Sequence, residues 1–192
     1  MLYLLKDQIL LLRKGGKSVF KHKSTMHINL RNSNKSEINI AFNLLKASAD
    51  FLKKKNINQW AYWLNPPMEK TQWVEDGFNK KEFYFIENKK KEILGMVRIL
   101  KEDLIYWGEM NDTASYIHSL VIKRRFSGKN IGSKVIDKIG KNASKNGIKY
   151  LRLDCDASNS KLCHYYESKG FNKIKSIRLP LGEYNLYQKN IT

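Results

Sequence analysis

The chain has 192 residues, enough for one domain with a sizeable core. Hydrophobic residues make up 42% of it and aromatic residues 11%, which excludes an intrinsically disordered chain. Its two cysteines exclude a disulfide framework and a cysteine-rich zinc site, and they are typical of the reducing cytoplasm, where we place the protein. The formal net charge of +18 makes nucleic acid, anionic membrane and phosphorylated cofactors candidate partners, although scattered lysines are equally typical of a solvated surface.

Residues 1–25 are interpreted as an extension ahead of a single domain over 26–192. The apolar run Leu2–Leu12 is interrupted by two charged residues and is shorter than the roughly 20 apolar residues of a transmembrane helix. It lacks the basic flank and the cleavage site of a signal peptide. A docked amphipathic arm and a misplaced start before Met26 rank equally as interpretations, and a membrane-surface helix ranks third. We expect no transmembrane segment.

The first half of the domain predicts two helices and a β-hairpin. A short strand over 26–31 precedes an amphipathic helix over 36–54, whose apolar residues recur at helical spacing. Asn34 and Glu37 have the spacing of a capping box at the start of this helix. An aromatic segment follows at 59–65, then a short helix at 69–78, a hairpin of strands at 82–87 and 92–100, and a polar loop at 101–113.

The second half alternates strands and helices. The predicted elements are a strand at 114–122, a glycine-containing loop at 127–132, a helix from there to about 146, a strand at 148–154, a helix at 159–169 closed by Gly170, and strands at 174–177 and 184–188. The resulting order, β-α-α-β-β-β-α-β-α-β-β, predicts a mixed α/β fold on one sheet.

The run Leu120–Gly132 carries the first functional motif, in which a strand ends, a loop turns and a helix begins. The unpaired N–H groups of a helix start, at the positive end of its dipole, bind anions such as a pyrophosphate. Gly128 and Gly132 allow close approach of a ligand, and Lys129 adds positive charge. The run contains neither a Walker motif nor a dinucleotide-binding glycine pattern. Taken alone, it suits an ordinary strand–turn–helix connection equally well.

A second motif lies about 30 residues downstream in the last predicted helix. It has the pattern N-x-x-φ-x-x-x-Y-x-x-x-G-F, formed by Asn159, Leu162, Tyr166, Gly170 and Phe171. With both motifs in place, the chain from about residue 26 to 190 resembles the GNAT superfamily of acetyltransferases. The loop resembles the superfamily's Q/R-x-x-G-x-G/A signature, and the last helix resembles its Asn…Tyr…Gly-Phe signature.

The resemblance implies a mostly antiparallel central sheet that is splayed between its fourth and fifth strands and flanked by helices. It also implies acetyl-CoA as the cofactor and direct transfer of the acetyl group to a primary amine of a small molecule or peptide. The runs Tyr116–Leu120 and Leu151–Cys155 further resemble a bacterial subgroup whose substrates are mostly unassigned. A monomer or a homodimer is expected.

By the same resemblance, the strand edge binds the pantetheine arm, an N–H near Val121 holds the thioester oxygen, and the loop binds the pyrophosphate. Ser127 replaces the usual Gln or Arg, and Asn130 replaces the usual Gly. Asparagine tolerates a left-handed backbone, so we expect Asn130 to hold the turn. The expected cofactor-binding residues are Leu120, Val121, Ile122, Ser127, Gly128, Lys129, Asn130, Ile131, Gly132, Ser133, Asn159 and Tyr166.

Tyr166 matches the superfamily's general acid, and the alternative is a packing tyrosine. The superfamily often has a glutamate base at the position of Tyr116, so Tyr116 leaves the base open. His118 lies on the same strand face and is an equally good base candidate or hydrogen-bonded strand histidine. Asp103 and Asp154 are weaker candidates, and no metal site is expected.

Trp60, Trp63 and Trp107 lie in regions that form the acceptor side of this fold, either as an aromatic wall or as ordinary core residues. Two further functional hypotheses remain open. One is a nucleic-acid- or ribosome-associated basic protein on the same scaffold, which we do not favour. The other is a coenzyme A binder without catalytic activity.

Overall fold

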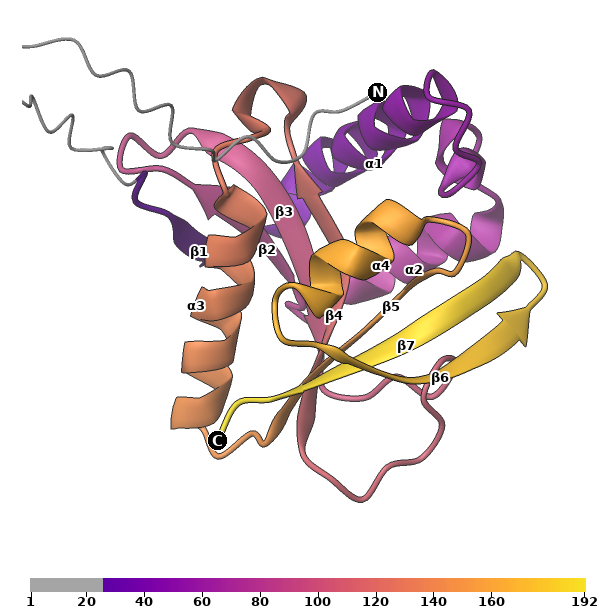
Figure 1. Cartoon of the computed structure of the whole chain (residues 1–192). Coiled ribbons are helices and arrows are strands. Elements are labelled where there is room, and N and C mark those ends of the chain that lie inside the picture. The colour runs from indigo at the N-terminus through magenta and orange to yellow at the C-terminus, as the bar shows by residue number, and fades with distance from the viewer. Residues whose placement is uncertain (1–25) are drawn as a thin grey trace, which may run out of the picture.

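A computed structural model describes residues 26–192, and the predicted docked arm or misplaced start at 1–25 lies outside the described residues. The chain forms a seven-stranded sheet with helices on both faces (Figure 1). The strands are β1 Asn29–Asn32, β2 Phe83–Glu87, β3 Ile93–Leu100, β4 Ala114–Ile122, β5 Tyr150–Asp156, β6 Asn172–Leu179 and β7 Gly182–Asn190. The α-helices are α1 Ile38–Lys53, α2 Met68–Asn79, α3 Ile131–Lys145 and α4 Ser160–Glu167, and short 3₁₀ helices occupy Lys35–Glu37, Ala61–Leu64 and Arg124–Phe126.

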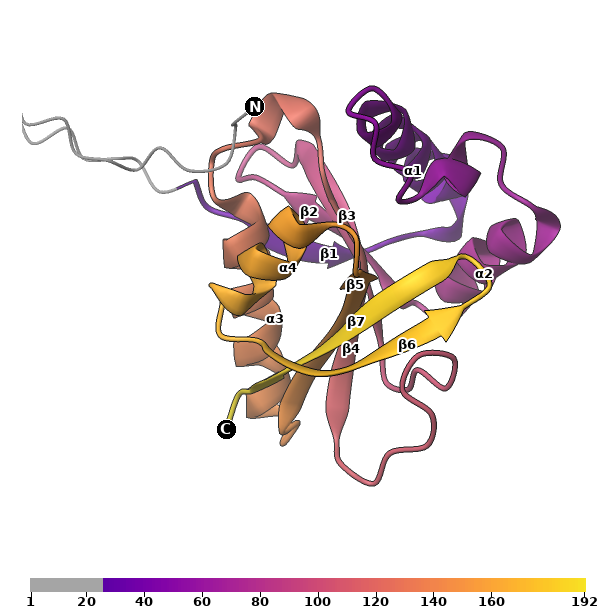
Figure 2. The ribbon, with the colours of Figure 1, turned by 45° about the vertical axis from the view of Figure 1, so that its right-hand side comes forward.

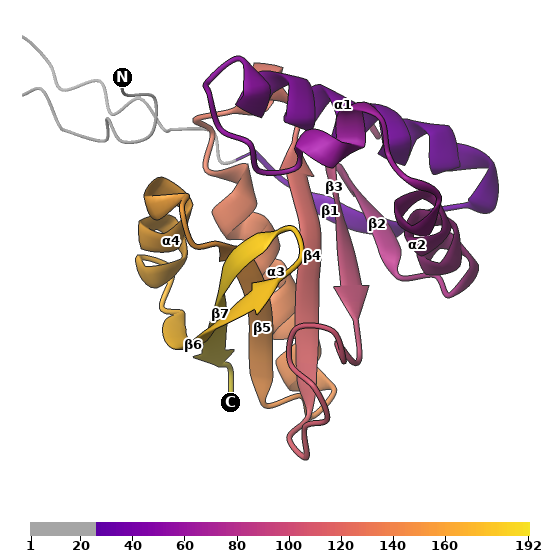
Figure 3. The same ribbon diagram turned by 90° about the vertical axis from the view of Figure 1, so that its right-hand side faces the viewer.

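The strand order is β1-β2-β3-β4-β5-β7-β6, and every neighbouring pair is antiparallel except the parallel pair β4–β5. Helices α3 and α4 cover one face of the sheet, and α1 and α2 cover the other (Figure 3). This arrangement confirms the predicted mixed fold. Between residues 26 and 192, no helix has both the length and the apolar character that a membrane span needs.

The start of α1 follows the predicted capping box. Asn34 and Glu37 exchange the two reciprocal capping hydrogen bonds, which satisfy N–H groups that a helix start leaves free. Arg31 on β1 binds Glu37 at 2.7 Å and Glu87 on β2 at 2.7 Å, so the cap is tied to the sheet. The buried face of α1 consists of Ala41, Leu44, Leu45 and Ala49, spaced for one side of a helix.

The closing hairpin is longer than its sequence pattern predicts. Strand β6 begins at Asn172 rather than 174 and ends at Leu179, and most of its residues are exposed. Its length is set by the hydrogen-bond ladder to β7, which pairs Asn172 with Gln188 and Leu179 with Gly182. Because exposed strand residues show no alternation of hydrophobic and polar side chains, the sequence pattern predicted only the central part of each strand. Figure 2 shows this hairpin beyond β5, at the opposite end of the sheet from β1.

Strand β4 carries a bulge beside β3. The register shifts between the pairs Met96–Val121 and Arg98–His118, and Ser119 takes a positive φ of 47°. Gly95 on β3 lies against this end of β4, where an added Cβ atom would overlap the carbonyl oxygen of Val121. The glycine therefore lets the two backbones approach closely at the point where β4 bends.

Candidate active site

Strands β4 and β5 form a fork. Their parallel pairing runs only from Ala114–Tyr150 to Ile117–Leu153. Beyond it, β4 continues through its bulge to Ile122 without pairing to β5. The free edge of β4 can accept an extended ligand in the manner of an added strand.

The expected strand-edge residues all lie at this fork. Val121 is buried, and Leu120 and Ile122 on either side of it are half-buried. Val121 belongs to the core beneath α1, whereas Leu120 and Ile122 pack against the core beneath α3. The side chains of residues 120–122 thus point alternately to the two faces of the sheet, and the backbone between them runs along the fork. The expected contacts with pantetheine require this placement of the backbone.

The loop after β4 leads directly into the start of α3. Asn130, the N-cap residue, has φ 54° and ψ 27°, which confirms the predicted left-handed backbone. Gly128 has φ 76°, and no atom lies within 4 Å of the Cβ position that it lacks. The loop is thus open at Gly128, and the N–H groups of Ile131, Gly132 and Ser133 begin the helix that follows it.

Gly132 has a structural role that the sequence alone did not indicate. A Cβ atom at this position would lie 3.0 Å from the hydroxyl of Tyr165 on α4. The glycine therefore allows α4 to approach the start of α3. The pyrophosphate loop and the last helix are consequently close neighbours.

Both arginines of the loop, Arg124 and Arg125, contact other side chains. The guanidinium of Arg124 lies 3.7 Å above the ring of Phe51 on α1, and Arg125 pairs with Glu92 at 2.8 Å. Lys129 lies 5.4 Å from the ring centre of Phe126 and is exposed, as is Ser127. Lys129 is therefore well placed to meet a phosphate near the start of α3.

The side chain of Asn159 makes two hydrogen bonds. Its side-chain oxygen accepts a hydrogen bond from the N–H of Leu162 at 3.2 Å, which makes it the N-cap of α4. Its amide group donates to Gln59 at 2.6 Å. Gln59 precedes the 3₁₀ helix between α1 and α2, so this bond draws that segment toward the fork. Gln59 was not among the predicted site residues because it is 100 positions away in the chain.

Tyr166 lies in the interior on α4 and is 9% exposed. Its ring packs against Phe171 at 5.9 Å and Tyr187 at 6.3 Å. Burial raises the pKa of its hydroxyl, with smaller contributions from the nearby thiols of Cys155 and Cys163. The phenol therefore keeps its proton at neutral pH and is available as a proton donor.

His118 connects two aspartates beside the fork. Its Nε2 atom lies 3.0 Å from Oδ2 of Asp103 in the loop between β3 and β4, and its Nδ1 atom lies 3.5 Å from Oδ1 of Asp154 on β5. All three side chains are largely buried, with 12%, 6% and 14% of their surfaces exposed. Asp154 is the first residue of β5 beyond the paired segment. We call these three side chains the base cluster.

The pKa values of the base cluster are shifted. Burial disfavours the charged imidazole of His118, but the hydrogen bond to Asp103 and the charges of both aspartates outweigh it and raise the pKa. Burial raises the pKa of Asp154 to about 6, and the charge of Asp103 adds to this effect while that of His118 opposes it. The shifts favour the charged imidazole of His118 and make the carboxylate of Asp154 a stronger base than that of an ordinary aspartate.

The ligand atoms of the base cluster come within 4.8 Å of one another, as in a metal site. However, the two nitrogens of His118 face different carboxylates. Ligands of one ion converge on a single point. This geometry fits a hydrogen-bonded relay better than a metal site.

Several aromatic side chains surround the base cluster, and the sequence did not indicate them. The rings of Trp73 on α2 and Tyr106 in the 101–113 loop lie 6.1 and 5.8 Å from that of His118. Tyr184 on β7 packs edge-on against Tyr106 at 5.3 Å. These residues come from three segments far apart in the chain, so spacing could not reveal them.

The remaining predicted residues lie in other packing clusters. The hydroxyl of Tyr116 accepts a hydrogen bond from Arg152 at 2.9 Å, and Arg152 also lies over the ring of Trp107 at 4.9 Å. Trp107 and Trp63 are each 4% exposed, and Trp63 packs beneath α1 and α2. Trp60 is half-buried with φ 67°. Of the three tryptophans, only Trp60 presents much surface to solvent.

Residues 50–171 match the sequence profile of the acetyltransferase (GNAT) family, which is more than half of the chain. The chain belongs to the GNAT acetyltransferase family. It is therefore an N-acetyltransferase that takes the acetyl group from acetyl-CoA. The open loop at Gly128, the helix start after Asn130 and the fork fit this cofactor.

Relatives and solved structures agree with this family. The uncharacterised N-acetyltransferase YesJ of Bacillus subtilis is 29% identical over 161 residues, which cover 78% of this GNAT chain and 82% of YesJ. A GNAT-family acetyltransferase of Listeria monocytogenes has a TM-score of 0.71 at 23% identity, covering 87% of this chain and 96% of its own. Spermidine N-acetyltransferase of Vibrio cholerae, in complex with CoA and spermine, has a TM-score of 0.59 at 16% identity, covering 85% and 95%. These structural likenesses show a shared fold.

Proposed function

We propose that this N-acetyltransferase transfers the acetyl group directly to a primary amine, with the base cluster taking a proton from the amine and Tyr166 giving one to the departing sulfur. The observation that carries the proposal is the placement of His118 between Asp103 and Asp154 at the mouth of the fork. Proton acceptors must lie at the reacting centre, and this cluster is where the two strands diverge.

Acetyl-CoA supplies an acetyl group activated as a thioester. The N–H groups at the start of α3 and the exposed Lys129 bind its pyrophosphate, and the free edge of β4 binds its extended arm. The backbone N–H near Val121 stabilises the negative charge that develops on the thioester oxygen. We assign Asn159, fixed by its bond to Gln59, to the residues that contact the cofactor.

Asp103 holds the imidazole of His118 through Nε2, so its Nδ1 side faces Asp154. The two carboxylates favour the charged form of His118, so we assign the role of proton acceptor to the carboxylate of Asp154. A pKa of about 6 makes this carboxylate ionised at neutral pH and a stronger base than an ordinary aspartate. Asp103 is then a positioning residue, and Asp154 is the group that takes the proton.

The chain's other predicted properties remain proposals. One sheet with two helical layers spans the described residues, which supports a single domain over 26–192. Both cysteines are buried free thiols, which supports the cytoplasm as the compartment. Cell fractionation with a compartment marker tests the second of these.

An acceptor screen tests the proposed function. The full chain is mixed with acetyl-CoA and with polyamines, amino acids, aminoglycosides and peptides in turn, and release of the free CoA thiol is followed together with the mass of the product. We expect at least one amine to gain a single acetyl group. Background hydrolysis is measured in the absence of an amine, and thiol release without an acetylated amine contradicts the proposal.

A further inference from the structure

One segment, residues 51–60, contacts both sides of the fork. It runs from the last turn of α1 toward the 3₁₀ helix that precedes α2. Phe51 lies beneath the guanidinium of Arg124 at 3.7 Å, and Arg124 follows the end of β4. Gln59 accepts a hydrogen bond from Asn159 at 2.6 Å, and Asn159 follows the end of β5. The continuations of the two diverging strands are therefore tied to the same short segment.

The bond between Gln59 and Asn159 joins the two helical layers. Gln59 leads into the 3₁₀ helix whose aromatic residues pack in the core beneath α1 and α2, whereas α4 packs in the same core as α3. The sheet lies between these layers, and α1 lies across the end of β4 (Figure 3). The bond is made beyond the end of β5, on the side of the molecule where β4 and β5 no longer pair. It therefore connects the layers at the open end of the fork.

The hydrogen-bond partners determine how the two side-chain amides face each other. The backbone N–H of Leu162 can only donate, so the atom of Asn159 that it meets at 3.2 Å is the oxygen. The amide nitrogen of Asn159 is then the atom that faces Gln59, and Gln59 presents its oxygen. An amide nitrogen carries two hydrogens. Asn159 can therefore donate one of them to a ligand while the other stays bonded to Gln59.

The backbone next to Gln59 is strained. Trp60 has φ 67° and ψ 11°, a left-handed conformation that is uncommon for a bulky residue. Strain of this kind persists only where the surrounding contacts hold it, and it gathers at functional sites. On one side the N–H of Trp63 donates to the carbonyl of Trp60 at 2.9 Å, and on the other Gln59 is bonded to Asn159. The segment is therefore held from both sides at the point where it meets α4.

We propose that Gln59 is a positioning residue for the cofactor, which presents the amide of Asn159 to the pantetheine arm and ties the two sides of the fork together. The inference rests on the proposed function, in which Asn159 contacts the cofactor. The arm contains amide groups, and their carbonyl oxygens accept hydrogen bonds from an N–H such as that of Asn159. A side chain that is already ordered loses less conformational entropy on binding, so the bond to Gln59 increases the affinity for the arm.

Binding of CoA and of a fragment without the arm tests this role. The fragment is adenosine 3′,5′-bisphosphate, and both ligands are titrated into the full chain by calorimetry in the absence of any amine, so no acetyl transfer is involved. Gln59→Leu keeps about the same size but removes the oxygen that accepts the bond. We expect this variant to bind CoA about three- to tenfold more weakly, as for the loss of one hydrogen bond, and to bind the fragment unchanged.

Three further variants identify the interaction. Gln59→Glu keeps an oxygen that accepts the N–H of Asn159, so its affinity for CoA is expected to stay within about twofold of the unaltered chain. Asn159→Asp keeps the oxygen that caps α4 but has no N–H to donate, and it is expected to weaken CoA binding as much as Gln59→Leu does. Gln72→Leu replaces an exposed glutamine of α2 that bonds to Asp76 in its own helix, and it is the control for loss of a glutamine.

Kinetics and thermal unfolding separate a positioning role from a general structural one. In Gln59→Leu we expect a raised KM for acetyl-CoA, a nearly unchanged kcat and a nearly unchanged unfolding midpoint of the cofactor-free chain. A merely structural role would instead lower both kcat and the midpoint, and it would weaken the binding of CoA and of the fragment alike.

The outcomes distinguish this inference from the proposed function. If Gln59→Leu binds CoA as the unaltered chain does, or weakens CoA and the fragment equally, the positioning role is overturned while acetyl transfer to an amine stands. If Gln59→Glu is as weak as Gln59→Leu, the accepted hydrogen bond is not the cause and the inference is wrong. If the expected order of affinities is found but no amine is acetylated, the role of Gln59 stands and the proposed function fails.

Discussion

The imidazole of His118 has a carboxylate on each side, and this placement determines which group can take a proton. Sequence reasoning ranked His118 above both aspartates because an isolated histidine titrates near neutral pH. In the structure, Asp103 lies 3.0 Å from one ring nitrogen and raises the pKa of His118, which favours the charged imidazole. The histidine thereby becomes the partner that keeps Asp154 in place.

The first prediction concerns pH. Because the base must be ionised and burial raises the pKa of Asp154 to about 6, kcat/KM is expected to fall about tenfold per unit below pH 6. The charged and titratable groups facing this carboxylate are His118, Asp103, Lys70, Tyr62, Tyr106 and Tyr184. The measurement is a pH–rate profile from pH 5 to 9.

Asp154→Asn removes this base and is expected to lower kcat/KM about 100- to 10,000-fold and to abolish the acidic limb. Asp156→Asn is the matched control, because Asp156 binds the backbone and hydroxyl of Ser158 instead of His118. An unchanged acidic limb in Asp154→Asn would assign the titration to another group.

The second prediction concerns Tyr166. Tyr166→Phe keeps the ring packed against Phe171 and Tyr187 but removes the proton for the leaving thiolate. We expect kcat to fall about 100-fold with little change in the KM for acetyl-CoA. Steady-state kinetics measure both, and Tyr84→Phe controls for loss of a hydroxyl elsewhere. Equal kcat values in Tyr166→Phe and the unaltered enzyme would refute the acid role.

At the scale of elements, the junction between β4 and α3 combines a fork, a loop and a helix start. Local rules predicted much of it. Asn130 adopts the left-handed backbone expected of an asparagine in that turn, and Asn34 and Glu37 form the expected capping box. Such features depend on a few neighbouring residues, so the sequence contains all that determines them.

The third prediction tests this junction. Asn130→Ala places a Cβ-bearing residue without a polar side chain in a left-handed conformation, which costs about 1–2 kcal/mol. We expect lower stability and weaker acetyl-CoA binding, because the helix start no longer holds its position. Asn130→Gly keeps the backbone freedom and both properties. Urea unfolding and calorimetry provide the measurements, and an alanine variant that matches the glycine variant would contradict the argument.

Contacts between distant elements could not be predicted in the same way. Asp103 meets His118 across a polar loop, Gln59 meets Asn159 across 100 positions, and Tyr62, Tyr106 and Tyr184 come from separate parts of the chain. Such contacts leave no periodicity or spacing in the sequence, because they depend on the path of the loops in the folded structure. Contacts of this kind therefore emerged only from the structure.

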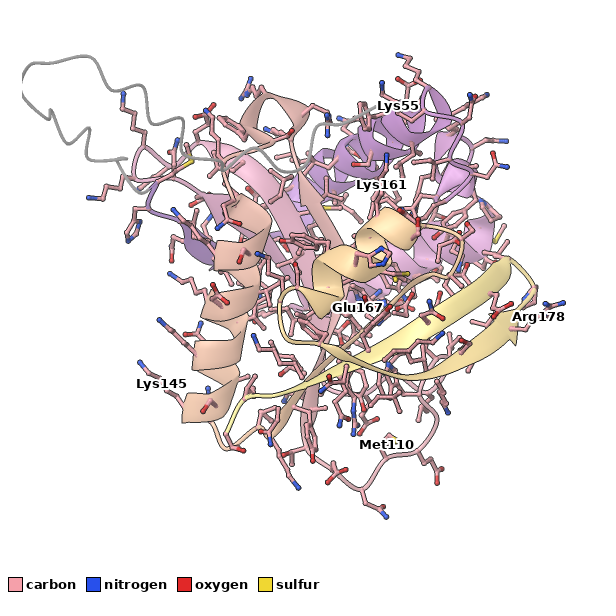
Figure 4. The ribbon with its side chains drawn as sticks, in the orientation of Figure 1. Lys55, Met110, Lys145, Lys161, Glu167 and Arg178 are labelled. Carbon is pink, nitrogen blue, oxygen red and sulfur yellow. The ribbon has the colours of Figure 1, made fainter. Side chains whose placement is uncertain are left out.

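At the scale of the whole molecule, the formal net charge is +18, and the lysines and arginines are scattered along the sequence. In Figure 4 the labelled Lys55, Lys145, Lys161 and Arg178 point outward from different regions of the surface. A nucleic-acid interface typically has basic residues on one face or along one helix. These four side chains do not form such a group, as expected of basic residues on a solvated surface.

The fourth prediction concerns the stability of the whole chain. Acetyl-CoA at 100 times its Kd should stabilise the fold by about 2.7 kcal/mol, because it binds the folded state alone. For a chain of this size the midpoint should rise by about 5–10 °C. Thermal unfolding with and without the cofactor measures this, with adenosine as the control ligand. A midpoint that does not move would remove the basis for cofactor binding.

The fold is expected to be sensitive to substitution of Gly95. The bend of β4 that opens the fork depends on a neighbouring strand that presents only a hydrogen atom to the carbonyl of Val121. Any other residue at that position, alanine included, must push the two backbones apart or straighten the bend. A position remote from the base cluster and from Tyr166 thus limits which sequences can keep the fork open, and random substitution can abolish activity there without touching a single reacting group.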